Sequence, residues 1–227
     1  MGRSEFHAEN FEKVDDFICS HLLPQDAALD AALENNRAVE LDAIDVAPNQ
    51  GKLLYLIAKM NNAKRILEIG TLGGYSSLWF AKAVPEDGKI ISLEISPEHA
   101  RVATANIKNA GFEKKVEVKV GPALETLKAM GKAGTEKFDM FFIDADKENN
   151  PNYFKWALEF SRKGSVIIVD NIVRFEGLRG WKGDPATAKG VRELFELMEV
   201  ERRVECTAVQ TVGSKGWDGF SMALVVE

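Results

Sequence analysis

From Arg65 onward, short apolar runs alternate with amphipathic stretches, and this alternation constrains the fold more than any other feature of the sequence. Five runs rich in β-branched or aromatic residues are expected to form strands: Arg65–Gly70, Lys89–Glu94, Val116–Val120, Asp139–Asp144 and Ser165–Asp170. Helical spacing is found between them, near Tyr75–Ala83, Pro97–Ala110, Pro122–Met130 and Asn152–Phe160. Because strands that alternate with helices build right-handed βαβ units, the sequence predicts an α/β fold around a parallel sheet with helices on both faces.

The two ends of the chain extend this core. Residues 1–60 have apolar residues at helical spacing, which predicts a helical region. This region either packs against the core or forms a lid or a dimer surface. A last helix and two more strands are expected at Pro185–Glu199, Val204–Val212 and Ser221–Val226. The two strands are separated only by Gly213–Gly219, which is too short for a crossover helix, so they should be antiparallel. The sequence contains no obvious interdomain linker, so residues 1–227 are expected to form one domain.

Composition excludes several classes of function. The chain has 29 Lys and Arg against 35 Asp and Glu, a net charge of −6, and lacks the basic block expected of a nucleic-acid-binding protein. No apolar run approaches the roughly 18 residues that a membrane-spanning helix needs. The cysteines, Cys19 and Cys206, are far apart and have no metal-ligand spacing. We therefore expect a cytoplasmic protein in a reducing compartment, without a nucleic-acid or membrane partner.

Two of the predicted strands end abruptly on acidic residues. F-F-I-D-A-D-K contains Asp144, Asp146 and Lys147, and V-I-I-V-D-N ends with Asp170 and Asn171. In an open parallel sheet, ligands bind beyond the carboxyl ends of the strands, so these side chains should converge at one edge. Hard cations such as Mg²⁺ prefer oxygen ligands of this kind.

A glycine-rich turn follows the first strand. E-I-G-T-L-G-G-Y-S runs from Glu68 to Ser76, and its glycines allow a ligand to approach the backbone. Glu94 ends the second strand, where an acid in doubly wound folds binds ribose hydroxyls. Glu68 lies inside an apolar run and needs a partner, which a cofactor ammonium group would provide. The turn before Ala123 could pack against an adenine. With no pyrophosphate-binding glycine spacing, this set favours S-adenosylmethionine over a nicotinamide dinucleotide.

The chain resembles the cation-dependent O-methyltransferases in the order and spacing of five motifs: E-I-G-T-L-G-G-Y-S, L-E-I, G-P-A-L, F-I-D-A-D-K and V-D-N. The resemblance covers roughly residues 44–227 and is nearest to the caffeoyl-CoA O-methyltransferase branch, with catechol O-methyltransferase more distant. It implies a class I methyltransferase fold, Rossmann-like, with a mostly parallel seven-stranded sheet and an antiparallel C-terminal strand. It also implies S-adenosylmethionine as methyl donor, Mg²⁺ (or Mn²⁺ or Ca²⁺) as metal, and a homodimer.

The resemblance assigns roles to individual positions. Asp144, Asp170 and Asn171 match metal ligands, and Lys147 matches a lysine near the acceptor hydroxyl, which makes Lys147 and Asp144 the predicted catalytic residues. The implied cofactor contacts are Val46, Glu68, Gly70, Thr71, Ser76, Glu94, Ala123, Asp144 and Asp146.

The acceptor is less well defined. After Asn171 the chain reads I-V-R-F-E-G-L-R-G-W, where plant relatives have a threonine–leucine–tryptophan stretch that helps to hold the acyl-CoA substrate. A smaller vicinal-dihydroxy phenol of catechol type, such as a phenylpropanoid or flavonoid, is therefore expected in place of caffeoyl-CoA. Lys147, Arg174, Trp181 and Trp217 are candidate substrate contacts. For Arg174 an exposed basic loop is an equal alternative, and for the two tryptophans so is a position outside the pocket.

Three other functions compete with this one. D-A-D after an apolar strand also occurs in metal-dependent phosphohydrolases of the haloacid dehalogenase type, but there a small residue and then Thr or Val follow, not Lys147 and Glu148. A nicotinamide-dependent reductase would need a different glycine spacing. A catalytically inactive cofactor-binding protein would keep the fold without the chemistry.

Overall fold

The core of the protein is a seven-stranded sheet with the strand order β3-β2-β1-β4-β5-β7-β6. The structure is a computed structural model that describes residues 8–173 and 185–227. The strands are β1 (Arg65–Ile69), β2 (Lys89–Glu94), β3 (Val116–Val120), β4 (Met140–Ile143), β5 (Val166–Asp170), β6 (Val204–Gly213) and β7 (Gly216–Val225). The five strands predicted for the parallel part of the sheet are confirmed, with ends that differ by one residue at most.

The order of the strands places the functional edge of the sheet. Strands β1 to β5 are mutually parallel, and β7 is antiparallel to both β5 and β6, as the sequence predicted. From β1 the chain first builds outward through β2 to β3, and then returns to the other side of β1 to form β4 and β5. This reversal creates a crevice at the carboxyl ends of β1 and β4, where ligands bind in folds of this type.

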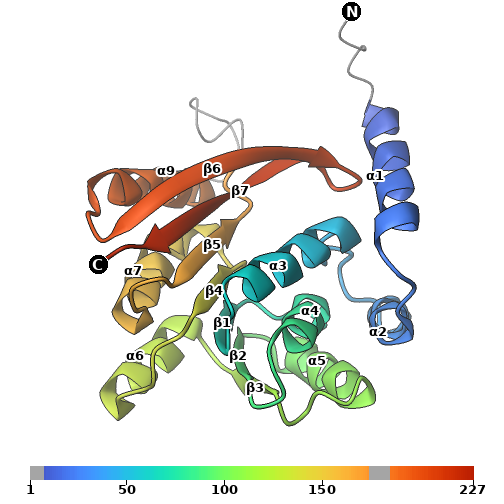
Figure 1. Ribbon diagram of the computed structural model, residues 1–227, viewed down its shortest axis with the longest axis horizontal. Helices are drawn as coiled ribbons and strands as arrows, with labels where there is room; N and C mark the ends of the chain where they lie inside the picture. The colour runs from blue at the N-terminus through green and yellow to red at the C-terminus, as the bar shows by residue number, and fades with distance from the viewer. Residues whose placement is uncertain (1–7, 174–184) are drawn as a thin grey trace, which may run out of the picture.

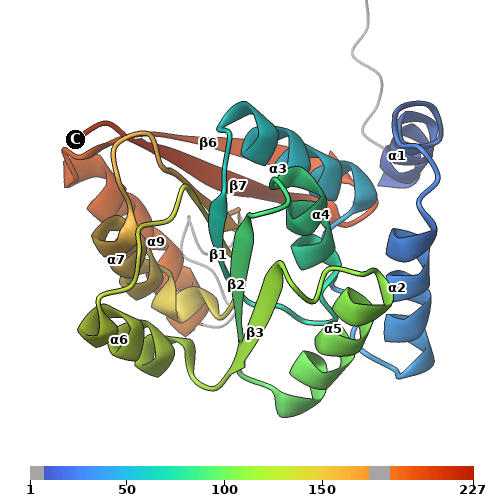
Figure 2. The same ribbon diagram turned by 60° about the horizontal axis from the view of Figure 1, so that its bottom comes forward.

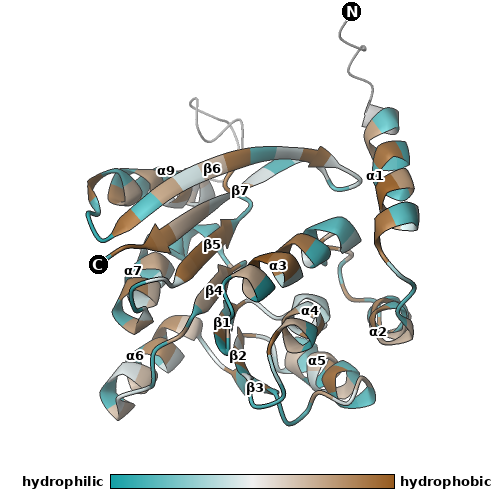
Figure 3. Ribbon diagram, viewed as in Figure 1, coloured by the Kyte–Doolittle hydropathy of each residue, from teal (hydrophilic) through white to brown (hydrophobic). Residues whose placement is uncertain are grey.

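Helices cover both faces of the sheet, giving three layers (Figures 1 and 2). Their bounds are α1 (Ala8–Leu22), α2 (Ala27–Ala38), α3 (Pro48–Met60), α4 (Tyr75–Ala83), α5 (Pro97–Asn109), α6 (Ala123–Ala133), α7 (Asn150–Phe160) and α9 (Pro185–Val200), with a 3₁₀ turn, η1 (Lys147–Asn149). Helices α3, α4 and α5 pack on one face and α6, α7 and α9 on the other. Figure 3 shows the central strands coloured mainly as hydrophobic, as burial on both faces requires.

Successive residues of the strands supply two separate cores. Phe142 packs with the α3–α5 layer and its neighbour Phe141 with the α6–α9 layer, and both are buried. Ile168 and Ile167 divide in the same way on β5. Because side chains alternate across a strand, unbroken apolar runs are what a sheet covered on both faces needs.

The N-terminal helices are attached to the core by polar contacts. In α1 the buried Asp15 accepts hydrogen bonds from Asn49 Nδ2 (2.8 Å) and from the amide of Ser214 (2.8 Å), which lies in the turn between β6 and β7. In α2 the buried Asn36 donates to Asp45 (3.0 Å) and accepts from Asn106 of α5 (2.9 Å). These contacts bring the N-terminal region, which carries no sequence motif, to the functional edge of the sheet.

The C-terminal hairpin differs from the sequence prediction. Its two strands extend to Gly213 and from Gly216, so Ser214 and Lys215 alone form the turn and Trp217 lies within β7. The predicted loop was too long because glycine is a poor strand former. Here the continuous ladder between the two strands outweighs that preference. No helix in the described ranges has the length and hydrophobicity to cross a bilayer.

Candidate functional site

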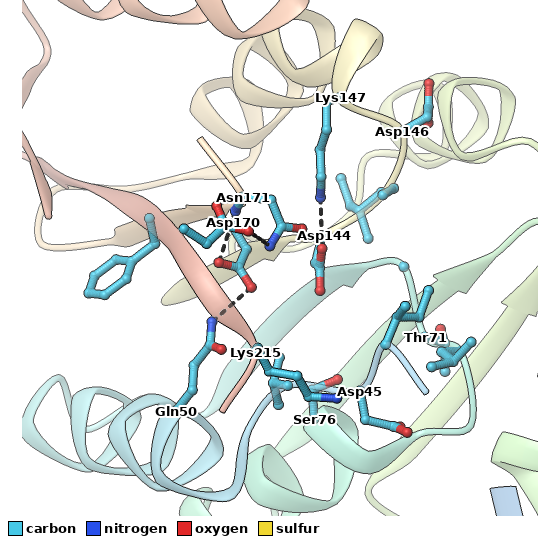
Figure 4. A pocket seen from close by; sticks show the side chains of 18 of the residues that line it. Asp45, Gln50, Thr71, Ser76, Asp144, Asp146, Lys147, Asp170, Asn171 and Lys215 are labelled. Atoms are coloured by element: carbon cyan, nitrogen blue, oxygen red, sulfur yellow. Dashed lines mark hydrogen bonds and ion pairs between the residues drawn. The ribbon is translucent and has the colours of Figure 1, made fainter. Parts of the chain in front are cut away.

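A cavity of about 1160 Å³ lies at the carboxyl ends of the parallel strands (Figure 4). Its lining comes from the ends of β1, β2, β4 and β5, from the beginning of α3 and from the hairpin turn. Of the residues predicted from the sequence, it brings together Val46, Gly70, Thr71, Ser76, Glu94, Ala123, Asp144, Asp146, Lys147, Asp170 and Asn171. The convergence predicted from strand ends is therefore present.

Gly70 allows the turn after β1 to pass close to β4. Its φ is +98°, and a Cβ at this position would overlap the backbone carbonyl of Asp144. The Gly70 amide donates to the Leu93 carbonyl at 2.9 Å, and the Asp144 amide donates to the Ile69 carbonyl at 2.8 Å. The ends of β1, β2 and β4 are thus joined at this point, and only glycine fits it.

Glu94 supports the glycine turn as well as lining the cavity. It is nearly buried, and its Oε2 accepts the backbone amides of Thr71 (3.1 Å) and Leu72 (2.9 Å). Its Oε1 accepts the Ser96 amide at 2.9 Å, with His99 Nδ1 at 3.6 Å. The sequence predicted Glu94 as a ribose ligand but gave no sign that it also organises the backbone of the turn.

Glu68 lies beneath the cavity and is not part of its lining. The carboxylate is completely buried and accepts hydrogen bonds from the hydroxyl groups of Ser76 (2.5 Å), Ser77 and Ser92 (2.5 Å). These three hydroxyls stand where the sequence predicted a cationic partner. Burial raises the pKa of Glu68 to about 7 in spite of the three donors.

Asp144 and Asp170 form the acidic end of the cavity, shown in Figure 4. Lys147 Nζ lies 2.7 Å from Asp144 Oδ1 and is only 10% exposed. Gln50 of α3 donates to Asp170 Oδ2 at 2.8 Å. Burial, and after it the negative charge of Asp144, raises the pKa of Asp170 to about 7. The two carboxylates are therefore close enough to repel each other.

Asn171 follows β5 in a left-handed backbone conformation, with φ of +55°. Its backbone amide donates to Asp170 Oδ1 at 2.9 Å, and its Nδ2 donates to Asp218 Oδ2 at 2.9 Å. Asp218 also lines the cavity, as do Asp15, Gln50 and Lys215. These four residues were missed from the sequence, because they lie outside the strand-end motifs and their place in the site depends on packing between distant elements.

Asp146 is fixed by neighbouring side chains. It accepts hydrogen bonds from the Tyr153 hydroxyl (2.5 Å) and from Asn149 Nδ2. Burial and the Asp146 hydrogen bond raise the pKa of Tyr153, so this phenol stays protonated and continues to donate. Asp146 therefore lines the cavity with both of its carboxylate oxygens held by neighbouring side chains.

Of the four residues predicted to contact the acceptor, the structure describes two, and of these only Lys147 lies in the lining of the cavity. Arg174 and Trp181 lie outside the described residues. Trp217 is 48% exposed, is not part of the cavity lining, and donates from its indole nitrogen to Gln210 Oε1 at 3.0 Å. Trp217 thus lies within β7 and outside the lining of this cavity, and its contact with the acceptor stays a prediction.

The donor set at the acidic end suits a hard cation in its chemistry. Within the described ranges, no three His, Cys, Asp or Glu side chains form a metal-holding group. Asp144, Asp170 and Asn171 instead offer two carboxylates and one amide. All three side chains offer oxygen atoms, the donors that Mg²⁺ prefers, and a cation held by Asp144 and Asp170 would offset their mutual repulsion.

The sequence of this chain is similar to those of known proteins of one family. A family model described as O-methyltransferase matches residues 25–223. A catechol O-methyltransferase of Mycobacterium tuberculosis is 48% identical over 212 residues, which cover 93% of this chain and 94% of that protein. A catechol O-methyltransferase of Niastella koreensis is 41% identical over 215 residues, which cover 95% and 97%.

Solved structures agree with the sequence relatives. The O-methyltransferase from Bacillus cereus in complex with S-adenosylhomocysteine superposes with a TM-score of 0.93 at 46% identity, covering 96% of this chain and all of that chain. TomG from Streptomyces achromogenes, in complex with S-adenosylmethionine, gives 0.92 at 42% identity, covering 98% of this chain and 100% of that one. These similarities set aside the phosphohydrolase and reductase alternatives. The chain belongs to the O-methyltransferase family.

Proposed function

We propose that this enzyme transfers a methyl group from S-adenosylmethionine to one hydroxyl of a vicinal-dihydroxy phenol, with a divalent cation, Mg²⁺ or a similar ion, as cofactor. The observation that carries the proposal is the convergence of the glycine turn, Glu94 and the Asp144–Asp170–Asn171 set in a single cavity. One end of that cavity offers the backbone of the glycine turn and Glu94 as the proposed ribose-binding acid. The other end offers the side-chain oxygens of Asp144, Asp170 and Asn171 as metal ligands. The relatives named catechol O-methyltransferase support the choice of acceptor.

The cofactor end suits a nucleoside with an amino acid tail. Thr71, Ser76 and Glu94 line it together with Val46 and Ala123, which are small or apolar. Glu94 would accept the ribose hydroxyls while it continues to hold the turn. The relatives from Bacillus cereus and Streptomyces achromogenes, whose solved structures contain S-adenosylhomocysteine and S-adenosylmethionine, support this assignment.

The acidic end would hold the cation through Asp144, Asp170 and Asn171. An ordinary phenol has a pKa of about 10, so little of it is ionised near neutral pH. When bound, a divalent cation supplies positive charge that stabilises the ionised phenol and orients its two neighbouring oxygens.

Lys147 is the side chain placed to take the proton. Its amine lies at the same rim of the cavity as Asp144 and is largely shielded from water. In the reaction, the acceptor oxygen forms a bond to the methyl carbon while the carbon–sulfur bond breaks and the sulfur keeps the electron pair. Holding the two reactants in line can contribute about 7–11 kcal/mol to lowering the barrier.

Transfer of labelled methyl from S-adenosylmethionine to catechol, with and without EDTA, tests the proposal. We expect transfer that EDTA abolishes and Mg²⁺ restores, and no methylation of a phenol that has a single hydroxyl. Asp144→Ala and Asp170→Ala should remove activity at limiting metal. Unchanged turnover in either variant would show that the metal assignment is wrong, and absence of transfer to any vicinal diol would favour a catalytically inactive cofactor-binding protein.

A further inference from the structure

We propose that Asp218 is a positioning residue that determines which atom of the Asn171 amide faces the cation site. The inference rests on the proposed metal site and adds a residue from the C-terminal hairpin to it. The side chain of Asn171 can contribute to a cation only through Oδ1, because its Nδ2 carries two hydrogens and has no free lone pair for a metal. The two ends of an amide have almost the same shape, so a neighbour must select the orientation.

The backbone around Asn171 is held firmly. Its own amide donates to Asp170 Oδ1 at 2.9 Å, and the next amide, of Ile172, donates to the Gly219 carbonyl at 3.0 Å. On the partner strand, Phe220 is paired with Asp170 in the β5–β7 ladder. With the backbone fixed by both strands, the remaining freedom of Asn171 lies in its side chain.

Asp218 removes that freedom. Its Oδ2 accepts Asn171 Nδ2 at 2.9 Å, and its Oδ1 accepts the backbone amide of Gly219 at 2.8 Å. An ionised carboxylate can only accept hydrogen bonds. It therefore requires the NH₂ end of Asn171, and the Asn171 oxygen turns away from it. Since Asp218 lines the same cavity as Asp144 and Asp170, this selection takes place at the acidic end.

The double role of Asp218 makes a distinctive prediction for its isostere. In Asp218→Asn, the Gly219 amide still needs an acceptor, so the new side chain places its oxygen there and its NH₂ toward Asn171. Asn171 must then either turn its oxygen toward residue 218, away from the cation, or leave two NH₂ groups facing each other. Asp218→Ala removes the same negative charge but leaves Asn171 free to turn its oxygen to the cation.

Calorimetric titration of Mn²⁺ into the full-length protein saturated with S-adenosylhomocysteine separates these cases. Loss of a partner that orients a metal ligand typically weakens metal binding about 10–100-fold. We expect such a loss for Asp218→Asn and a loss at least about threefold smaller for Asp218→Ala. The exposed Asp87, changed to Asn, is the charge-matched control and should bind as the wild type does.

A double variant provides the second comparison. Asn171→Asp with Asp218→Asn keeps the wild-type charge. The new carboxylate at position 171 can accept from the new amide at position 218 with one oxygen and offer its other oxygen to the cation. We expect the Mn²⁺ affinity of this variant to return to within about threefold of the wild type. Thermal unfolding and S-adenosylhomocysteine affinity are measured for each variant and identify a variant that fails to fold. If a single variant of Asp218 fails to fold, the Mn²⁺ affinity of the double variant decides the test.

The outcomes are distinct. If Asp218→Asn and Asp218→Ala bind Mn²⁺ with equal affinity, Asp218 contributes only its charge and the inference is overturned. The inference is also overturned if the double variant binds Mn²⁺ as weakly as Asp218→Asn does. In both of these cases the wild type still binds Mn²⁺, so the proposed function stands. If the wild type itself takes up neither Mn²⁺ nor Mg²⁺, the metal-dependent function fails, and the role of Asp218 fails with it.

Discussion

At residue scale, Glu68 combines complete burial with a titratable group. Burial raises the pKa of its carboxyl group from 4.5 to about 7, so the folded state binds the proton more tightly than the unfolded chain does. The contribution of protonated Glu68 to stability is therefore fully present below about pH 4.5 and is lost as the pH rises to about 7.

Glu68→Gln should remove this pH dependence, because glutamine resembles the protonated acid and does not titrate. Relative to the variant, the wild type should lose up to about 3 kcal/mol of unfolding free energy between pH 4.5 and 8. Urea denaturation of both proteins at pH 5 and pH 8 measures the difference. Parallel pH profiles would contradict the assignment of the raised pKa to Glu68.

Lys147 makes a separate prediction at the same scale. Its amine is placed beside Asp144 and is expected to accept the proton of the acceptor hydroxyl. Lys147→Ala should lower kcat about 10²–10⁴-fold while leaving S-adenosylhomocysteine affinity within about twofold, as removal of a general base does. Lys155→Ala, an exposed lysine on α7, is the matched control. Equal losses in rate and in cofactor affinity would argue for a structural role instead.

At element scale, the turn between β1 and α4 depends on Gly70. An alanine there would combine a left-handed φ with overlap of the Asp144 carbonyl, and would push β1 and β4 apart at the cofactor site. We expect Gly70→Ala to cost more than about 2 kcal/mol of stability and to abolish S-adenosylhomocysteine binding.

Gly134 supplies the control for this prediction. It has φ of +71° at the end of α6, and a Cβ there would meet nothing within 4 Å. Gly134→Ala should therefore cost only about 1 kcal/mol and leave ligand binding intact. Thermal denaturation and calorimetry compare the two variants; if they behave alike, backbone strain alone matters and the close approach to Asp144 does not.

At the scale of the whole molecule, the described residues leave an apolar surface exposed on α3 and β6. Leu53, Leu56 and Met60 of α3 and Val209 of β6 are exposed by 37%, 44%, 73% and 47%, and a hollow of about 470 Å³ lies between α3 and the hairpin strands. Contiguous exposed apolar surface of this kind is typical of protein–protein interfaces. We propose that a second copy of the chain covers it in a homodimer.

The homodimer is tested by light scattering after size-exclusion chromatography. The wild type should have the mass of a dimer, and Leu56→Glu with Met60→Glu should have that of a monomer, because burial of two carboxylates is costly. Val200→Glu introduces a charge at an exposed apolar residue at the end of α9 and should remain dimeric. A monomeric wild type, or a dimer that tolerates both changes, would rule out this surface.

Much of the fold could be predicted because its signals are local. The apolar runs of β1, β2, β4 and β5, the helical spacing between them and the glycine turn each lie within a few residues of sequence. The gathering of Asp144, Asp146 and Asp170 follows as well, since parallel strands end at one edge of the sheet. The predicted bounds of strands were less accurate where backbone pairing with a neighbouring strand lengthened them, as in the hairpin strand that contains Trp217.

The sequence by itself determined the strand cores, the glycine turn and the acids that end β4 and β5, because periodicity and composition act over neighbouring residues. Only the tertiary structure decided which partners those residues meet. Asp170 binds Gln50, 120 positions away, and Asn171 binds Asp218, 47 positions away. Glu68 meets Ser92 only because β1 and β2 pair in one register. Hydrogen-bond partners depend on how elements pack and align, and no local pattern in the chain contains that information.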